Sequence, residues 1–271
     1  MRLLSWNLFH GRDFPPDPAL FTWRSRLLRI TEWNATHAQV NRPLLDEFTG
    51  WLRGAEWDLA LLQEAPPRWA AALARGTQAG GALALTSRNS LGALRAAVAD
   101  RNPDLIASNE GGSNQLLARG GLRLLEVRRL TLTARPERRR MLWARVGLAN
   151  GRALAVANVH ATAGAPHAAA RDVERAAERA VEWAGALPLI FGGDLNLRPG
   201  HDPEPFELMR ERFGLAPPTG ERSIDHLLAR GLRVVEPPHP LEAEGRELPG
   251  PRGLRLRLSD HAPVVAAVSV E

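Results

Sequence analysis

Short apolar runs recur along the whole chain, and most of them end in or beside a polar side chain. The runs cover residues 2–8, 59–63, 116–118, 153–159, 187–191 and 263–270. Short runs bounded by Gly, Pro or Asn are typical of buried strands whose ends emerge into loops. We therefore expect the polar side chains that follow these strands to gather along one edge of the fold.

Helical patterns separate several of these runs. Residues 43–54 align apolar side chains on one stripe, and residues 166–185 alternate alanine with Glu and Arg at helical spacing. Residues 122–132 and 141–147 have the pattern of neighbouring antiparallel strands. The expected fold is α/β, of α+β type: a four-layer sandwich of two packed mixed β-sheets flanked by helices.

The polar motifs span the whole sequence, so we expect one domain over residues 1–271. The Pro-, Gly- and Glu-rich stretch 236–253 is predicted to be a long loop at the surface or at the edge of a site. Four tryptophans are interpreted as core residues, the alternative being a base-stacking or lipid-binding surface. They are Trp23, Trp33, Trp51 and Trp57.

Composition excludes several mechanisms. The chain has no cysteine, so a disulfide, a thiolate nucleophile and a cysteine-bound zinc ion are all ruled out. Its net charge of +5 is compatible with a polyanionic partner, but a preference for arginine codons would give the same composition. The sequence lacks a signal-peptide pattern and a bilayer-length apolar window, which predicts a cytoplasmic protein without a membrane span.

The glycine-rich segment after residues 187–191 carries a carboxylate and an amide two positions apart. Gly192 and Gly193 allow a sharp turn and a close approach to a ligand. Asp194 could orient or deprotonate a water molecule, and Asn196 could donate to phosphoryl oxygens as charge grows on them. The alternative is an ordinary turn stabilised by Asp and Asn side chains.

Two further motifs combine a carboxylate with a histidine. Asp260 and His261 stand side by side before the last strand, and His261 is a candidate base or phosphate contact. Asp225 could hold the other ring nitrogen of His261 and fix its tautomer. The pattern leaves open whether Asp194 or His261 takes the proton, and a lone histidine at a strand start is often only structural.

Glu64 ends an apolar strand, where a carboxylate costs free energy unless it binds a cation or a donor. We expect it to be the principal Mg²⁺ ligand, with Mn²⁺ as an alternative ion, since Mg²⁺ typically binds one or two carboxylates. Asn7, at the end of the first run, is its expected neighbour. The alternative for Glu64 is a charge at a helix amino terminus before Pro66.

Four other residues are candidates for contact with the substrate. His160 closes a buried run and could stabilise a phosphoryl oxygen, although a structural histidine is the alternative. Asn114 is a weaker candidate of the same kind. Arg139 and Arg140 belong to a basic run that either contacts substrate phosphate or forms a solvated turn.

In this order and over nearly the whole chain, the WNL, QE, VH, GDLN, IDH and SDH motifs resemble the endonuclease/exonuclease/phosphatase superfamily. The resemblance implies a four-layer sandwich and Mg²⁺-dependent cleavage of phosphate esters by an activated water. It implies that Asn7 and Glu64 lie on the metal side. Asp260 would contribute to that side directly or through water.

The same resemblance assigns the remaining motif residues. It makes Asp194 the water-orienting acid, Asn196 the phosphate-binding amide and His261 the terminal catalytic histidine, with Asp225 as its paired acid. His160 matches the central histidine of the deoxyribonuclease-like, sphingomyelinase-like and inositol-phosphatase-like branches. The absence of tyrosine disfavours the apurinic-endonuclease branch.

The leading hypothesis is a nuclease or another phosphodiesterase. A phosphomonoesterase, or a phosphatase acting on phospholipid or inositol phosphate through the same site, is the second, with Phe14, Phe21 and Trp23 as a candidate apolar rim. A catalytically silent binding scaffold is the third. It requires an essential group to be missing, whereas the motif set is complete.

Overall fold

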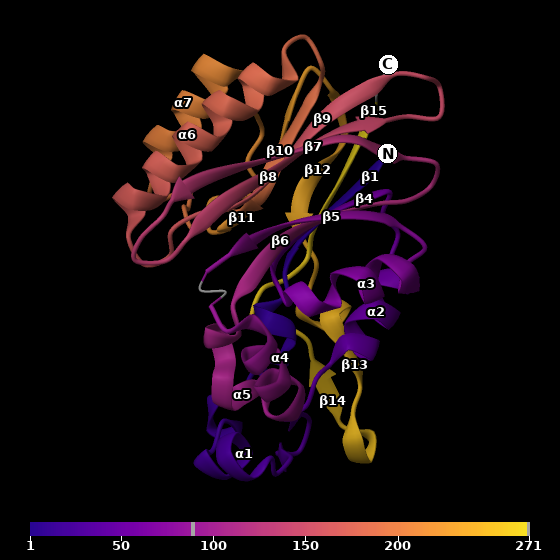
Figure 1. Cartoon of the computed structure of the whole chain (residues 1–271), viewed down its shortest axis with the longest axis vertical. Helices are drawn as coiled ribbons and strands as arrows, with labels where there is room; N and C mark the ends of the chain where they lie inside the picture. Colours follow the sequence, from indigo (N-terminus) through magenta and orange to yellow (C-terminus); the bar gives the residue numbers. More distant parts are fainter. Residues whose placement is uncertain (88–89, 270–271) are drawn as a thin grey trace.

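Two β-sheets pack face to face in the computed structural model, which describes residues 1–87 and 90–269 (Figure 1). In spatial order, the first sheet contains β12 (Arg233–Pro240), β15 (Val264–Ser269), β1 (Arg2–Asn7), β4 (Leu59–Ala65), β6 (Gly112–Ala118) and β5 (Gly80–Thr86). The second contains β11 (Asp225–Arg230), β10 (Leu189–Asp194), β9 (Ala153–His160), β8 (Arg139–Gly147) and β7 (Arg123–Thr133). Val270, the predicted end of the last strand, lies outside the described residues.

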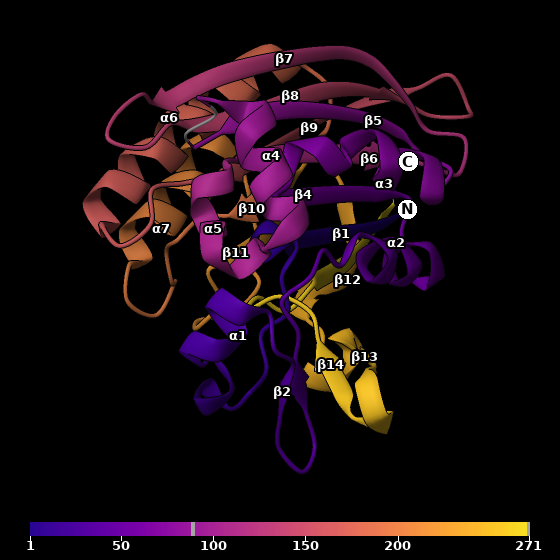
Figure 2. The same ribbon diagram turned by 60° about the horizontal axis from the view of Figure 1, so that its bottom comes forward.

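Helices cover the outer faces of both sheets. The second sheet is covered by α6 (Pro166–Ala184) and α7 (Pro203–Phe213), and the first by α2 (Leu45–Gly54) and α3 (Ala70–Gly76). Three short helices gather at one end of the sandwich: α1 (Trp23–Leu28), α4 (Gly92–Arg101) and α5 (Pro103–Ile106) (Figure 2). Single 3₁₀ turns are η1 (Phe9–Gly11), η2 (Pro18–Leu20), η3 (Pro67–Trp69), η4 (Ala107–Glu110), η5 (Ala243–Arg246) and η6 (Pro251–Gly253).

Three apolar layers hold these elements together. One packs α6 and α7 against the second sheet through residues such as Val173 and Phe191. Another lies between the sheets and includes Leu61 and Val156. The third packs α2 and α3 on the first sheet, around Trp6 and Phe48. Three apolar layers between four structural layers confirm the predicted α/β sandwich.

Both sheets are mixed, and each has one parallel pair near its middle. In the first sheet β1 runs parallel to β4, and in the second β9 runs parallel to β10. The strands that flank these two parallel pairs run antiparallel to them. The carboxyl ends of a parallel pair leave the sheet on the same side, which is where ligands bind in open α/β sheets.

Two small hairpins form a lobe at the end of the sandwich where α1 lies (Figure 2). They are β2 (Glu32–Trp33) with β3 (Ala38–Gln39), and β13 (Glu247–Pro249) with β14 (Arg255–Arg257). His37 Nε2 lies 3.0 Å from Glu247 Oε1, and Arg255 N donates to Thr36 O at 2.9 Å. The hairpins therefore contact each other, although their sequences lie far apart.

Two sequence interpretations need correction. The stretch 236–253 is only partly a loop, because its first residues complete β12 and residues 247–249 form β13. Trp57 is buried and Trp51 half-buried, but Trp23 is 65% and Trp33 46% exposed, so the core interpretation is wrong for these two. Trp33 lies on β2 in the lobe and Trp23 on α1 beside it, outside the two packed sheets.

Within the described part of the chain, none of the helices combines the length and the hydropathy needed to cross a lipid bilayer.

Candidate active site

The carboxyl ends of the two parallel pairs face each other across the interface between the sheets. Asn7 Nδ2, from β1, donates to Asp194 Oδ2, from β10, at 3.0 Å. His160 Nε2, from β9, lies 3.8 Å from Glu64 Oε1 of β4 and 3.6 Å from Asp194 Oδ2. Four of the predicted site residues therefore form one cluster, although they come from both sheets.

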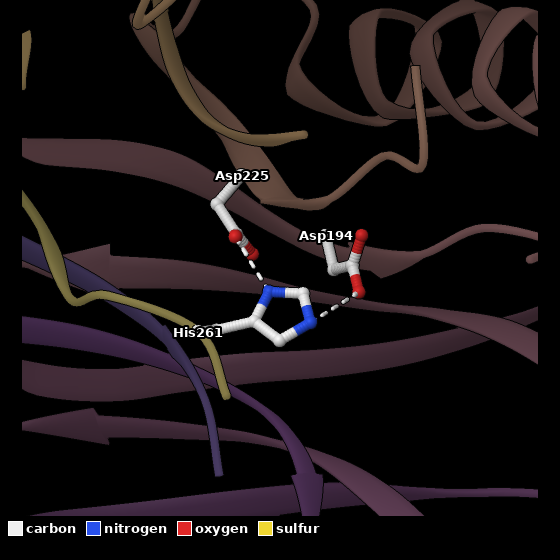
Figure 3. Close-up of side chains that lie close together, drawn as sticks. All are labelled: Asp194, Asp225 and His261. Atoms are coloured by element: carbon white, nitrogen blue, oxygen red, sulfur yellow. Dashed lines mark hydrogen bonds and ion pairs between the residues drawn. The ribbon is translucent and has the colours of Figure 1, made fainter. Parts of the chain in front are cut away.

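Asp225 and His261 form an ion pair at the edge of this cluster (Figure 3). His261 Nδ1 lies 2.7 Å from Asp225 Oδ2, as the sequence predicted, and its Nε2 lies 3.9 Å from Asp194 Oδ2. Burial alone lowers the pKa of His261, but the hydrogen-bonded carboxylate of Asp225 outweighs it and holds that pKa well above its ordinary value. The imidazole therefore favours the charged form, with Nε2 facing Asp194.

Asp194 is buried beside a second carboxylate, unlike an ordinary carboxylate on the protein surface. Burial, reinforced by the charge of Asp225, raises the pKa of Asp194 to about 7. Asn196 N donates to Asp194 Oδ1 at 3.1 Å, and Asn196 Nδ2 donates to Ala161 O at 3.2 Å. A carboxyl group that titrates near neutral pH is suited to general acid–base chemistry.

Glu64 lies in a strained stretch of β4. Its φ of 45° falls in the left-handed region, and the pairing of β4 with β6 shifts register between Leu62 and Ala65. Its side chain is 24% exposed, and His10 Nε2 lies 3.2 Å from its Oε2. Burial raises the pKa of Glu64, but the interaction with His10 outweighs it and leaves that pKa well below its ordinary value.

Sequence reasoning missed His10. It is buried in η1, directly after the strand that ends at Asn7, and it has a φ of 53°. Its other ring nitrogen, Nδ1, is buried without a hydrogen-bond partner. The available signal was a histidine followed by Gly11 just beyond a strand that already carried a candidate ligand.

His160 is held by an arginine. Arg139 Nη1 lies 2.9 Å from His160 Nε2 and 3.1 Å from Nδ1, and Arg139 Nη2 binds Glu137 Oε2 at 2.7 Å. Burial, and then the charge of Arg139, lowers the pKa of His160 to about 3. His160 is therefore neutral at neutral pH, and Arg139, one of the two arginines predicted to bind substrate, lies beside it.

Two other predicted substrate contacts are not brought into the cluster. Asn114 is wholly buried between the sheets, where its Nδ2 donates to Arg140 O at 2.7 Å. The guanidinium of Arg140 instead lies by β7, with Nε 3.3 Å from Thr131 Oγ1. Substrate contacts by Asn114 and Arg140 therefore stay predictions.

Among the described residues, one cluster of acidic and histidine side chains has the geometry to hold a metal ion, and the sequence predicted a different group. Ligand atoms of Asp194, Asp225 and His261 lie within 4.8 Å of one another, but the raised pKa of His261 favours an imidazolium, which pairs with Asp225 and has no free lone pair for a cation. The other group is the predicted one of Asn7, Glu64 and Asp260.

The predicted group fits a hard cation better. Burial raises the pKa of Asp260, and the negative charge of Glu64 adds to that rise although His261 opposes it. Both carboxylates are partly open to solvent. A cation bound between Glu64 and Asp260 would remove their mutual repulsion, and oxygen ligands are those that Mg²⁺ prefers.

The sequence profile described as the Endonuclease/Exonuclease/phosphatase family matches residues 4–261. The chain belongs to this family, whose members are hydrolases that act on phosphate esters. No curated protein matches the chain significantly.

Solved structures of similar fold include enzymes with different substrates. A mannosyl-6-phosphatase from Bacteroides thetaiotaomicron is 15% identical with a TM-score of 0.66, and each chain covers all of the other. The catalytic domain of human Nocturnin with bound sulfate is 14% identical with a TM-score of 0.62, over 99% of this chain and 93% of that one. D. rerio TDP2 complexed with single-strand DNA product is 14% identical with a TM-score of 0.58, over 100% and 99%.

Proposed function

We propose that the chain is a divalent-metal-dependent phosphodiesterase that cleaves nucleic acid, with residues 1–271 forming one domain. The observation that carries the hydrolytic part of this proposal is the contrast between Asp194 and His261, whose Oδ2 and Nε2 atoms lie 3.9 Å apart. The carboxyl group titrates near pH 7, and the imidazole favours its charged form. One group is suited to take a proton from water, and the other to donate a hydrogen bond to phosphate.

In the proposed mechanism Asp194 accepts the proton of the attacking water. Asn7 Nδ2 and Asn196 N hold its two oxygens in place, at 3.0 and 3.1 Å. These two donors fix the direction in which the carboxylate receives the proton. Its position at the carboxyl end of β10 brings it beside the face where the ester would lie.

The charged His261 stabilises the phosphoryl oxygens as negative charge grows on them. Asp225 keeps Nδ1 occupied, so Nε2 is the nitrogen that faces the reacting group. Neutral His160 accepts from Arg139 Nη1 through Nε2, so the guanidinium of Arg139 is the second donor on this side of the proposed site. The amide of Asn196 has one bond to Ala161 O, which leaves a donor hydrogen for the substrate.

A divalent cation, which we propose to be Mg²⁺ or Mn²⁺ held by Glu64, Asn7 and Asp260, would supply positive charge to the phosphate. Glu64 is suited to hold it because its low pKa keeps the carboxylate ionised. The Oδ1 atom of Asn7 accepts from Phe9 N at 3.0 Å, which fixes the orientation of that amide.

A second candidate function is a phospholipid-type diesterase. Phe9, Phe14 and Phe21 form a continuous line of ring contacts, with centroids 5.6 and 5.5 Å apart, and Phe14 and Phe21 are exposed. This line begins two residues after Asn7, and the neighbouring Trp23 is also exposed. An exposed aromatic rim next to a phosphate site favours an amphiphilic substrate.

The test is to incubate the protein with separate substrates, each with Mg²⁺ and with EDTA. The substrates are single-stranded DNA, duplex DNA, RNA, phospholipid vesicles, and a chromogenic diester and monoester. Cleavage of nucleic acid that depends on Mg²⁺ and weakens steeply with salt is expected. Cleavage of the vesicles alone would favour the second candidate.

The matched variants are His261→Ala, in the site, and His201→Ala, exposed on a turn. The first is expected to lower turnover by at least about 100-fold, and the second to leave it unchanged. Full activity of a folded His261→Ala protein would reject the proposed mechanism.

A further inference from the structure

Asn158 is a polar side chain in a place where the packing is otherwise apolar. It lies on β9, two residues before His160 and two after Val156, and it is wholly buried between the two sheets. Val156 and Leu61 belong to the apolar layer in this interface. Burying an amide there costs free energy unless its donors and acceptor are bonded.

Three side-chain hydrogen bonds join Asn158 to the first sheet. Its Nδ2 donates to Leu62 O on β4 at 2.9 Å and to Gln115 O on β6 at 2.8 Å. Its Oδ1 accepts from Gln63 Nε2 at 2.8 Å. One amide from the second sheet therefore bonds two neighbouring strands of the first.

These contacts occur where the pairing of β4 and β6 is interrupted. Leu62 and Gln115 are opposite each other, and the next pair joins Ala65 to Ser113, so β4 contains one extra residue. Glu64 lies in that bulge and has a positive φ. A non-glycine residue keeps such a conformation only when its surroundings hold it there.

We infer that Asn158 is a positioning residue that holds the β4 bulge and thereby directs Glu64 toward the bound cation. The inference rests on the proposed function, because it takes Glu64 to be a metal ligand. Residues that orient a metal ligand without contacting the metal themselves affect how tightly the metal binds. Asn158 is not a catalytic residue, since it contacts the bulge and not the reacting atoms.

The close packing of Gly193 against Asn158 supports this role. A Cβ atom on Gly193 would lie 3.0 Å from Asn158 Oδ1 and 2.0 Å from Val159 O. Only a glycine leaves the amide and the strand of Asp194 this close together. Asn158 thus lies between the segment that carries Glu64 and the segment that carries Asp194.

The experiment compares Asn158→Leu with Val156→Ala in the full chain. Leucine has a similar volume, adds no charge and suits the apolar layer, but it removes all three bonds. Val156→Ala disturbs the same strand and the same face without touching the bulge. Asn158→Ser replaces the leucine variant if that protein does not fold, as judged by circular dichroism.

Binding of Mg²⁺ alone is measured by calorimetry at a temperature where every variant is folded. We expect Asn158→Leu to weaken binding at least about tenfold, and Val156→Ala to stay within about twofold of the parent. Hydrogen exchange of the peptides covering residues 61–66 and 113–116 should become faster only in the Asn158 variant. Parent-like affinity and parent-like exchange in folded Asn158→Leu would overturn the inference.

Glu64→Gln separates this inference from the proposed function. If Glu64→Gln binds Mg²⁺ like the parent, the proposed metal role of Glu64 fails, and so does the link from the bulge to the cation. If Glu64→Gln loses binding while Asn158→Leu keeps it, the proposed function stands and the inference about Asn158 is wrong.

Discussion

Glu64 and Asp194 are carboxylates at the ends of two facing parallel pairs, yet their environments push their pKa values in opposite directions. Glu64 is partly exposed and has His10 beside it, which holds its pKa below the ordinary value. Asp194 is buried, and its burial together with the charge of the neighbouring Asp225 raises its pKa to about 7. The first sheet therefore presents an ionised carboxylate, which we propose as a metal ligand, and the second presents a carboxyl group that titrates near neutral pH, which we propose as the proton acceptor.

The difference shows how one chemical group serves two roles in a single site. Sequence position alone treats the two residues alike, because each follows a buried strand. Their roles are separated by the neighbours that the opposite sheet and the connecting turns supply. In enzymes, carboxylates whose pKa values are pushed apart take different parts in acid–base chemistry.

The largest expected effect follows from removing the proton acceptor. Asp194→Asn keeps the shape of the side chain but cannot take a proton from water. We expect kcat to fall at least about 1000-fold, with the affinity for Mg²⁺ nearly unchanged. Steady-state kinetics at saturating Mg²⁺ measures the first, and calorimetry the second. Asp46→Asn, on an exposed position of α2, is the control and should behave like the parent.

Removing the charge of Glu64 should change the Mg²⁺ dependence of the activity more than kcat at saturating Mg²⁺. In Glu64→Gln we expect the Mg²⁺ concentration for half-maximal activity to rise about 10- to 100-fold, because a carboxylate ligand has become an amide. Saturating Mg²⁺ should restore much of kcat. The control is Glu182→Gln, an exposed change on α6. If both site variants lost kcat equally at saturating metal, the division of roles between the sheets would be wrong.

The two carboxylates should also have opposite effects on stability as pH changes. Because the folded pKa of Asp194 is raised above 3.8, the parent should lose stability relative to Asp194→Asn as pH rises from about 4 to about 7. Because the folded pKa of Glu64 is lowered, the parent should lose stability relative to Glu64→Gln as pH falls below about 4.5. Urea unfolding in EDTA across this range measures both, and parallel trends would contradict the comparison.

The smallest expected effect concerns Arg140, which lies outside the cluster. Arg140→Gln should leave hydrolysis of a small chromogenic diester unchanged. If the substrate is nucleic acid, the slope of log binding constant against log salt should decrease by about 1. Arg145→Gln, on the same strand at an exposed position, is the control and should not change the slope. An unchanged slope for both variants would remove Arg140 from the substrate contacts.

The sequence was informative where burial controls structure. The apolar runs 2–8, 153–159 and 187–191 predicted strands, which the structure contains as β1, β9 and β10, and the alternation of strands with helices predicted the sandwich. The pairing of Asp225 with His261 was also predictable, because two short motifs near strand ends offered a carboxylate and an imidazole. Local apolar patterns reflect burial, so strands and their order can be predicted from the sequence alone.

The remaining features depend on contacts between distant segments. The positive φ at Glu64 has no sequence signal, because glycine is the usual mark of that conformation and a glutamate stands there. The contact of His10 with Glu64 requires the η1 turn to fold back on β4. Trp23 is exposed on α1, which lies beside the lobe and beyond the two packed sheets, and residue type cannot indicate that position.

The lobe of two hairpins bears on how this scaffold can diversify. Its parts come from opposite ends of the chain and are joined by the contact of His37 with Glu247 and by the bond from Arg255 to Thr36. It reaches the site through Leu258, whose N donates to Arg246 O just before Asp260. Of the proposed site residues, by contrast, Asn7, Glu64, His160, Asp194 and Asp225 lie on strands of the two packed sheets, and Asn196, Asp260 and His261 lie on connections beside those strands. Exchanging one hairpin alone would therefore break their shared interface, whereas exchanging both together would leave the strands of the two packed sheets unchanged.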